Sequence, residues 1–418
     1  MNSSTRWMLW LVFFFWIPLQ VHAQSRTLTI DEAAALFEQN SLQQELARLE
    51  ELRRRGEARR YRAFANPEIS IFSEQLNAGT LNYDETTYMI SQPVELAGQP
   101  FLRNRSADKS MMAARHAFEF DRSLLVQQVK TLYTEYWYLQ QTLGVYDRAL
   151  AVVERVLQSA RDRQAEGTAP GIQVQRFTVE KNRYLRLRNE AELELMQAGR
   201  QLASMITSSP DPDFALEVVT DMPVKPLLQN GETLREYALQ HRADLLALQM
   251  EAEALDLNYR VEKRERLPDL RLNVGYKNQS DGSRGFVIGG GIQLPLFNRN
   301  SGNITMAEAA QRRAETALQI KRRTIGNEVD IAYLRVQQLY EQWLGMQQHP
   351  VSPQMLETAQ TAYREGHYSL VELLDATGAW TDGQIFSYRI TADYHQALYN
   401  LDTITSGTLF STQTSTEQ

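Results

Sequence analysis

Cysteine is absent from the 418 residues of the chain. Its absence excludes disulfide bonds, thiolate metal sites, a cysteine nucleophile and acylation of an N-terminal lipoprotein cysteine. Basic charge is in deficit too: the formal net charge is −7, which argues against binding of nucleic acid through a basic face. The mean hydropathy of −0.44 excludes a protein built from many membrane-spanning helices.

Long apolar runs are scarce, and the one that stands out begins at Trp7. It is shorter than the roughly 20 apolar residues that a membrane-spanning helix needs, and it contains Pro18. Arg6 precedes the run and a small-residue pattern ending at Ala23 follows it, so residues 1–23 are predicted to be a secretory signal peptide. A membrane anchor is the alternative. If the exported chain enters a membrane, it does so through β-strands.

The chain repeats itself at a spacing of roughly 200 residues, which indicates an internal duplication. Capping-box patterns, prolines beside alternating stretches and Glu-Gly pairs recur in the same order. We predict a first repeat over 24–207, a linker over 208–230, a second repeat over 231–407 and a C-terminal tail over 408–418. The paired landmarks are Thr29 with Thr233, Pro67 with Pro268, Pro93 with Pro295, Val129 with Val329, Tyr133 with Tyr333, and Gly167 with Gly366.

Each repeat is expected to begin with a helix, over about 30–65 and 233–266, which a proline ends. Two short stretches with a period of two follow, the pattern of β-strands joined by polar hairpin loops. In the second repeat Leu270, Leu272 and Val274 fall on one face and alternate with polar or small residues. The predicted strands are 68–75, 86–94, 270–276 and 286–294, and the predicted loops are 76–85 and 277–284.

Long helices follow the strands. Apolar residues at alternating spacings of four and three run without a break from Leu125 to Ala160. A sustained repeat of about 3.5 residues is typical of coiled-coil packing. The sequence therefore predicts a helix over about 106–165, on the order of 90 Å long, that turns at Gly167 and returns over 172–207.

The second repeat shows the same design. The chain turns at Gly366 and returns over 370–405. Pro350 and Pro353 are expected to kink or briefly break its outgoing helix.

Four strands with one apolar face and two open edges cannot sit alone in lipid, because each unpaired backbone group would cost several kcal/mol. Two copies would give eight strands with a filled interior, whereas three would give 12 strands with room for a lumen. The second face carries Arg271, Asn273 and Gly289, which suit water. We therefore favour a trimer with its helices packed into a tube. A small soluble β-domain beside a coiled coil is the alternative.

The sequence resembles the TolC-like family of outer-membrane channels over nearly all of the mature chain, and its closest branch looks like the CzcC-type outer-membrane factors of heavy-metal efflux. The segments that carry the resemblance include Asn-Pro-Glu-Ile-Ser, Pro-Leu-Phe-Asn-Arg-Asn-Ser-Gly-Asn-Ile and Tyr-Arg-Glu-Gly. They lie at 66–70, 91–98, 267–270, 294–304, 363–366 and 370–376.

The resemblance implies an α+β, mostly α fold and a homotrimer: a 12-stranded outer-membrane β-barrel, with four strands from each chain, above a long α-helical coiled-coil tunnel in the periplasm. It implies docking through a periplasmic adaptor (membrane fusion) protein to an inner-membrane pump of the RND type, which supplies the energy. Contact with outer-membrane lipid is implied, whereas no cofactor and no chemistry are.

The resemblance also places the closed tip of the tunnel at the helix turns. Glu372 and Asp375 match positions of acidic rings in relatives and lie three residues apart on one helix. Three copies would put six carboxylates around the pore, a ring that favours cations. An ordinary solvated helix face is the alternative.

Tyr363 matches a tyrosine that latches adjoining coils in some relatives. The acidic partner position holds Gln173 here, and the basic latch position holds Tyr368. A hydrogen bond between Tyr363 and Gln173 would contribute about 0.5–1.5 kcal/mol. We expect the tip to close mainly by packing and by a balance of carboxylate repulsion.

The adaptor is expected to contact the same turns, although the glycines there would also serve the turn conformation itself. This expectation rests on the resemblance alone. The candidate contact residues are Gly167, Thr168, Ala169, Gly366, His367, Tyr368 and Ser369.

Neither a metal site nor an active site is predicted. None of the six histidines pairs with another at helical spacing, and His367 near the tip is an outside candidate for a metal ligand. No phosphate loop and no Ser-His-Asp arrangement stands out, so an enzyme is not expected.

The predicted function is a passive export duct for heavy-metal cations. Drugs or other small molecules are the alternative cargo, because the pump selects what is exported. An exported coiled-coil structural protein without a pore is the alternative of another class.

Overall fold

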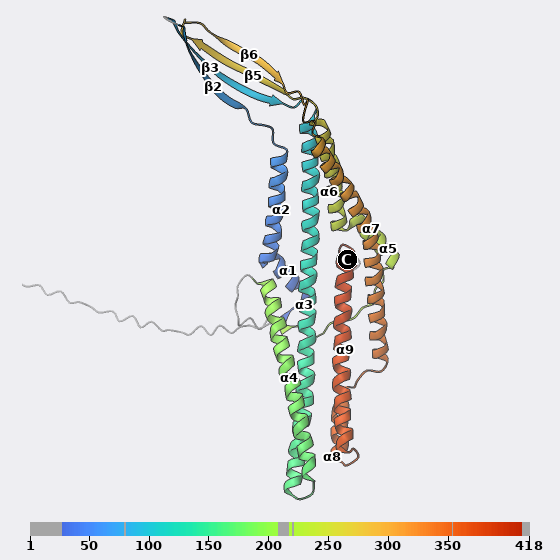
Figure 1. Ribbon diagram of the computed structural model, residues 1–418. Helices are drawn as coiled ribbons and strands as arrows, with labels where there is room; N and C mark the ends of the chain where they lie inside the picture. Colours follow the sequence, from blue (N-terminus) through green and yellow to red (C-terminus); the bar gives the residue numbers. More distant parts are fainter. Residues whose placement is uncertain (1–26, 79–80, 208–216, 220, 353, 412–418) are drawn as a thin grey trace, which may run out of the picture.

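Figure 1 shows an elongated chain, with a small β-sheet at one end and long helices that run away from it. The longest helix, α3 (Gln99–Ala165), has 67 residues and is therefore about 100 Å long. This computed structural model describes residues 27–78, 81–207, 217–219, 221–352 and 354–411.

The sheet contains four antiparallel strands in the order β2-β3-β5-β6. The strands extend well into the predicted hairpin loops, so the loop bounds 76–85 and 277–284 were wrong. Mostly polar residues continue the backbone pairing there: Gln75 is opposite Asp84, and Asn278 is opposite Arg284. The bounds are β2 (Glu68–Ala78), β3 (Leu81–Val94), β5 (Leu270–Gln279) and β6 (Arg284–Ile292).

One face of the sheet is apolar and exposed. Cross-strand pairing aligns apolar side chains in rows that cross all four strands. The outer strands β2 and β6 pair on one side only within the described chain. The sheet thus has the apolar face and the two open edges that the alternating sequence predicts. The two clearest rows are Ile69, Ile90, Val274 and Ile288, and Ile71, Tyr88, Tyr276 and Phe286.

The opening helix of the first half is interrupted, so the prediction of one continuous helix was wrong. The break between α1 (Ile30–Asn40) and α2 (Leu42–Tyr61) lies at Ser41, whose backbone is extended. Its N–H donates to the carbonyl of Phe37 at 3.0 Å, and its hydroxyl accepts from the N–H of Gln43 at 3.2 Å. One serine therefore ends the first helix and caps the second.

The second half breaks at the matching point, between α5 (Gly231–His241) and α6 (Ala243–Arg264). Arg242 occupies the break, is only 3% exposed, and forms ion pairs with Asp244 and Glu328. A buried arginine needs such partners, because an uncompensated buried charge is costly. The prediction of a single helix over 233–266 was wrong for this reason.

Two helical hairpins form the end of the molecule opposite the sheet (Figure 1). The first joins α3 to α4, and the second joins α8 to α9. Helices α4 and α9 both pack against α3. The bounds are α4 (Gly171–Ile206), α7 (Ser301–Gln348), α8 (Met355–Arg364), α9 (Leu370–Ile404) and α10 (Thr408–Ser411).

The interruption expected near Pro350 is a complete break between α7 and α8, not a kink. The connecting segment lies against α9, where the side-chain amide of Gln384 donates to the carbonyl of Val351 at 3.0 Å. Gly383 permits this approach, because a Cβ there would lie 2.6 Å from a methyl group of Val351. The second expected breaker, Pro353, lies outside the described residues.

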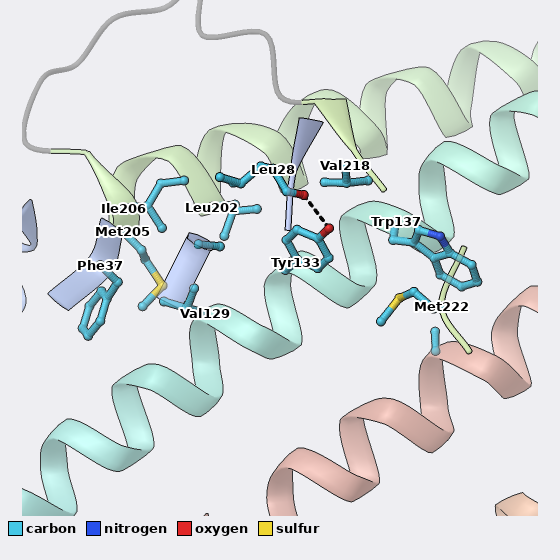
Figure 2. Packing of buried hydrophobic residues seen from close by; sticks show 12 residues of the cluster. Leu28, Phe37, Val129, Tyr133, Trp137, Leu202, Met205, Ile206, Val218 and Met222 are labelled. Atoms are coloured by element: carbon cyan, nitrogen blue, oxygen red, sulfur yellow. Dashed lines mark hydrogen bonds between the residues drawn. The ribbon is translucent and has the colours of Figure 1, made fainter. Parts of the chain in front are cut away.

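A buried cluster joins the first helix, the linker and the helical hairpin at mid-length. Figure 2 shows Tyr133 of α3 inside this cluster, with its hydroxyl donating to the carbonyl of Leu28 at 2.6 Å. The N–H of Val219 donates to the same hydroxyl oxygen at 3.3 Å. Beside them β1 (Thr27–Leu28) pairs in parallel with β4 (Glu217–Val218), a short strand within the linker.

Parts of the predicted domain plan fall outside the described residues. They are the whole signal peptide (1–23), residues 208–216 and 220 of the linker, and residues 412–418 of the tail. None of the helices in the described part of the chain is both long enough and apolar enough to cross a bilayer.

Candidate functional site

The two hairpin turns lie at the end of the helices away from the sheet, and they are built in the same way. After α3 the carbonyl of Arg163 accepts hydrogen bonds from the N–H groups of Thr168 at 2.9 Å and Ala169 at 3.2 Å. Gly167, directly before Thr168, has φ 76°, a left-handed conformation that favours glycine. The resulting turn presents Gly167 and Thr168 to solvent at the extreme end of the hairpin.

The second turn copies the first. The carbonyl of Ala362 accepts from the N–H groups of His367 at 2.8 Å and Tyr368 at 3.1 Å, and Gly366 has φ 79°. The side chain of Tyr368 is 41% exposed, and that of His367 is exposed beside Glu365. Both glycines therefore serve the turn conformation, while the surrounding side chains remain free to meet a partner.

Tyr363 ties the second hairpin to the first. Its ring is 6% exposed and meets Phe177 of α4 edge-on, with ring centroids 5.8 Å apart. The guanidinium of Arg163 donates to the hydroxyl of Tyr363 at 3.1 Å and lies 5.2 Å from the centre of its ring. A cation over an aromatic face and a hydrogen bond from a charged donor are both attractive. The three side chains therefore connect α8 with α3 and α4.

The partner expected from sequence, Gln173, does not have this role. No hydrogen bond joins Gln173 to Tyr363 within the described residues, where the backbone N–H of Gln173 donates instead to Pro170. Sequence reasoning missed Arg163, because the resemblance directed attention to the positions of an acidic and a basic latch residue. The roughly 200-residue repeat carried a usable signal, since Arg163 and Tyr363 occupy nearly equivalent places before Gly167 and Gly366.

Glu372 and Asp375 both lie in the first turns of α9, and both are exposed. Glu372 forms a capping box with Ser369: the Ser369 N–H donates to the carboxylate at 2.6 Å, and the Glu372 N–H donates to the hydroxyl at 3.3 Å. The backbone and side-chain hydrogen bonds from Ser369 hold the pKa of Glu372 below its usual range. Glu372 thus helps to cap the N-terminus of α9, and its lowered pKa keeps the carboxylate ionised at neutral pH.

Asp375 makes no such contact and projects from α9 one turn later, with a neighbour in Leu373 that is fully buried. Helix α9 therefore begins with one face buried against α3 and α4, and with Glu372 and Asp375 on its exposed side. Among the described residues, no group of three or more His, Asp or Glu side chains is placed to hold a metal ion.

The fold and the two turns together define a class. A sheet with one apolar face and two open edges, set above long paired helices that end in exposed turns, is the subunit of a channel with a helical duct. Solved structures agree on the fold. The chain matches CusC with a TM-score of 0.76 at 18% identity, over 90% of this chain and 91% of that chain. It matches the Campylobacter jejuni CmeC outer membrane channel with a TM-score of 0.79 at 15% identity, over 93% and 88%.

Residues 234–407, which lie in the second half of the chain, match the family described as outer membrane efflux protein. The predicted fold class, mostly helical with four antiparallel strands per chain, is confirmed. The protein is an outer-membrane efflux channel and not an enzyme. The alternative of a structural protein without a pore is therefore set aside. TolC-like channels form trimers in tripartite efflux systems.

One curated relative covers most of the chain, and a second covers about three fifths of it. The cobalt-zinc-cadmium resistance protein CzcC of Cupriavidus metallidurans is 23% identical over 402 residues, which is 93% of this chain and 92% of the relative. The nickel and cobalt resistance protein CnrC of the same organism is 25% identical over 273 residues, 62% of this chain and 63% of the relative.

Proposed function

We propose that three copies of this chain form one continuous duct that exports heavy-metal cations across the outer membrane. The match to a cobalt-zinc-cadmium resistance protein over nearly the full length of both chains carries the choice of cargo. The fold supports the trimer. In the described chain the outer edges of β2 and β6 are unpaired, and three sheets joined edge to edge would leave no unpaired edge. The apolar rows of the four strands would then face lipid.

In this proposal the duct is passive, and an inner-membrane pump of the RND type supplies energy through a periplasmic adaptor. The adaptor would contact the exposed turns around Gly167, Thr168 and Ala169 in one hairpin, and around Gly366, His367, Tyr368 and Ser369 in the other. These residues are exposed except Ala169, which is half-buried, and their backbone N–H groups already donate hydrogen bonds within the turns. A partner can therefore dock without unfolding the hairpin.

We further propose that the contact of Arg163 with Tyr363 and Phe177 holds the end of the duct closed. Opening would separate the α8–α9 hairpin from α3 and α4, and this contact lies on that boundary. Glu372 and Asp375 would then line the entrance as rings of carboxylates that favour cations. The exposed, ionised state of Glu372 supports this arrangement.

The cargo is tested by deleting the gene and measuring growth in cobalt, zinc, cadmium, copper and silver beside a drug panel. The proposal predicts sensitivity to at least one metal, restored by the wild-type gene, with no change for the drugs. Drugs are the second candidate cargo, and sensitivity to drugs alone would replace metals with small molecules as the exported class.

A further inference from the structure

A cavity of about 740 Å³ lies at mid-length, where the linker crosses the helices, and we call it the belt cavity. Its walls come from the start of α1, from α3, from residue 219 and residues within 221–229, and from the last turns of α9. Aromatic and apolar side chains make up much of the wall. They include Tyr133, Met222, Pro226, Tyr394 and Leu398.

The tyrosine hydroxyls at this cavity already have structural partners. Tyr133 donates to the carbonyl of Leu28 at 2.6 Å, and Tyr394 donates to the carbonyl of Lys225 at 2.5 Å. These hydrogen bonds fix the linker and the chain start against α3 and α9. The rings therefore form a rigid wall, and their polar ends are satisfied without any ligand.

His395 differs from the tyrosines. It lines the cavity, is only 8% exposed, and neither ring nitrogen has a hydrogen-bond partner among the described residues. The rings of Tyr394 and Tyr399 lie 5.7 Å and 6.0 Å from it, centroid to centroid. Buried polar groups are nearly always hydrogen-bonded, because an unsatisfied one has lost its hydrogen bonds to water without replacement. The backbone of Met222 acts on the ring without a well-formed hydrogen bond, so an imidazole with spare hydrogen-bonding capacity lies beside the cavity.

The charge around the cavity points to a neutral partner. Burial lowers the pKa of His395, and the backbone of Met222 offsets only part of this effect, so the imidazole is neutral and offers one donor and one acceptor. The charged lining residues balance: Asp31 and Asp221 are opposed by Lys130 and Lys225. The lining therefore has no net formal charge that would attract a cationic or an anionic ligand.

We propose that the belt cavity binds an uncharged aromatic molecule of drug-like size that both donates and accepts a hydrogen bond at His395. The volume falls within the roughly 300–1,000 Å³ typical of small-molecule sites. A ligand there would contact both repeats and the linker at once. The site is separate from the hairpin turns, and its existence does not depend on which cargo the duct carries.

The test uses the full-length protein in detergent and 2-naphthamide as the probe, because its amide supplies one acceptor and a donor beside an aromatic system. Isothermal titration calorimetry should detect saturable binding at one site per chain. Naphthoate and naphthylmethylammonium, which share the ring system but carry a charge, should bind at least tenfold more weakly. Equal binding of the charged probes, or the absence of saturable binding, would overturn the proposal.

Variants separate a binding role of His395 from a purely structural one. His395→Phe keeps a ring of similar shape and should weaken binding tenfold or more, whereas His395→Gln keeps a donor and an acceptor and should lose less than threefold. His349→Phe, at the exposed end of α7, is the matched control and should bind as the wild type does. Unchanged affinity in His395→Phe, with its melting temperature preserved, would contradict the assignment.

Discussion

Arg163 and Tyr363 show how much a single pair of side chains can contribute where two hairpins meet. The ring of Tyr363 is buried against Phe177. The guanidinium of Arg163 donates a hydrogen bond to the tyrosine hydroxyl and also lies over the face of the ring. A hydrogen bond from a charged donor contributes about 1.5–3 kcal/mol, and a cation over an aromatic ring about 0.5–1 kcal/mol at an exposed site. Loss of the pair should therefore favour separation of the hairpins.

We expect Arg163→Ala to raise the single-channel conductance in planar bilayers, because it removes both interactions. Tyr363→Phe should have a smaller effect in the same direction, since it removes the hydroxyl but keeps the packing on Phe177. Arg161→Ala, which deletes the same charge from an exposed position two residues away, is the control. If Arg163→Ala conducts no more than Arg161→Ala does, this pair does not hold the duct closed.

The carboxylates of α9 call for a substitution that separates their charge from the capping box. Glu372→Gln with Asp375→Asn removes both charges, and glutamine still accepts from the Ser369 N–H. Reversal potentials in a salt gradient should show lower cation selectivity than in the wild type. Glu365→Gln, a neighbouring exposed carboxylate outside the proposed ring, should leave selectivity unchanged. An unaltered reversal potential in the double variant would remove these residues from the ion path.

His395 makes stability depend on pH in a defined direction. Burial lowers its pKa in the folded chain below the ordinary value of 6.5, so the unfolded chain binds a proton that the folded chain rejects. Stability is therefore retained above about pH 7 and is lost progressively as the pH falls below 6.5. The drop in melting temperature from pH 7.5 to pH 5.5 should be smaller in His395→Gln than in the wild type. An equal drop in both proteins would exclude this residue as the cause.

At the scale of elements, the segment between α7 and α8 packs closely against one glycine of α9, Gly383. A side chain at Gly383 would overlap Val351, whereas a Cβ added at Gly378, about one and a half turns earlier on the same helix, would meet no atom of a neighbouring segment within 4 Å. Gly383→Val should lower the free energy of unfolding by about 1–3 kcal/mol and increase proteolysis of the connecting segment. Gly378→Val, with the same change in helix propensity, should do neither. Identical proteolysis of the two variants would show that the close contact has no structural importance.

The elements that sequence predicted best are those with an unbroken pattern. The four-three spacing from Leu125 to Ala160 and the alternation from Leu270 to Tyr276 both appear as expected. The breaks at Ser41 and Arg242 were missed, because helical periodicity continues through each of them. A cap and a buried ion pair decide these positions, and both depend on contacts that periodicity does not encode.

The candidate site was predictable only in part, and for a similar reason. Gly167, Gly366 and the Ser369–Glu372 capping box are local patterns, so sequence located them. The partner of Tyr363 is 200 residues away in the chain. The belt cavity around His395 likewise arises from segments that meet only in the folded chain.

At the scale of the whole molecule, the chain has the surface expected of one subunit of a trimer. Its apolar sheet face is exposed and its edge strands are unpaired, which would be a liability for a solitary exported protein. The duplicated order of helix pair, hairpin, long helix and return helix gives each chain two hairpin turns at the same end. Three copies would present six turns in a ring to the adaptor.

Edge-to-edge closure of the sheets can be tested directly because the chain has no cysteine of its own. Ile71→Cys on β2 would be combined in turn with Phe286→Cys, Ile288→Cys or Ile292→Cys on β6, and the protein oxidised in outer membranes. Tyr88→Cys with Tyr276→Cys, directly opposite each other on β3 and β5, serves as an oxidation control within one chain.

If three sheets close into one duct, at least one β2–β6 pair yields a covalent trimer on denaturing gels, while the single variants and the control pair stay monomeric. Only monomers from every β2–β6 pair, with the control pair fully oxidised, would contradict the claim that three sheets close into one duct.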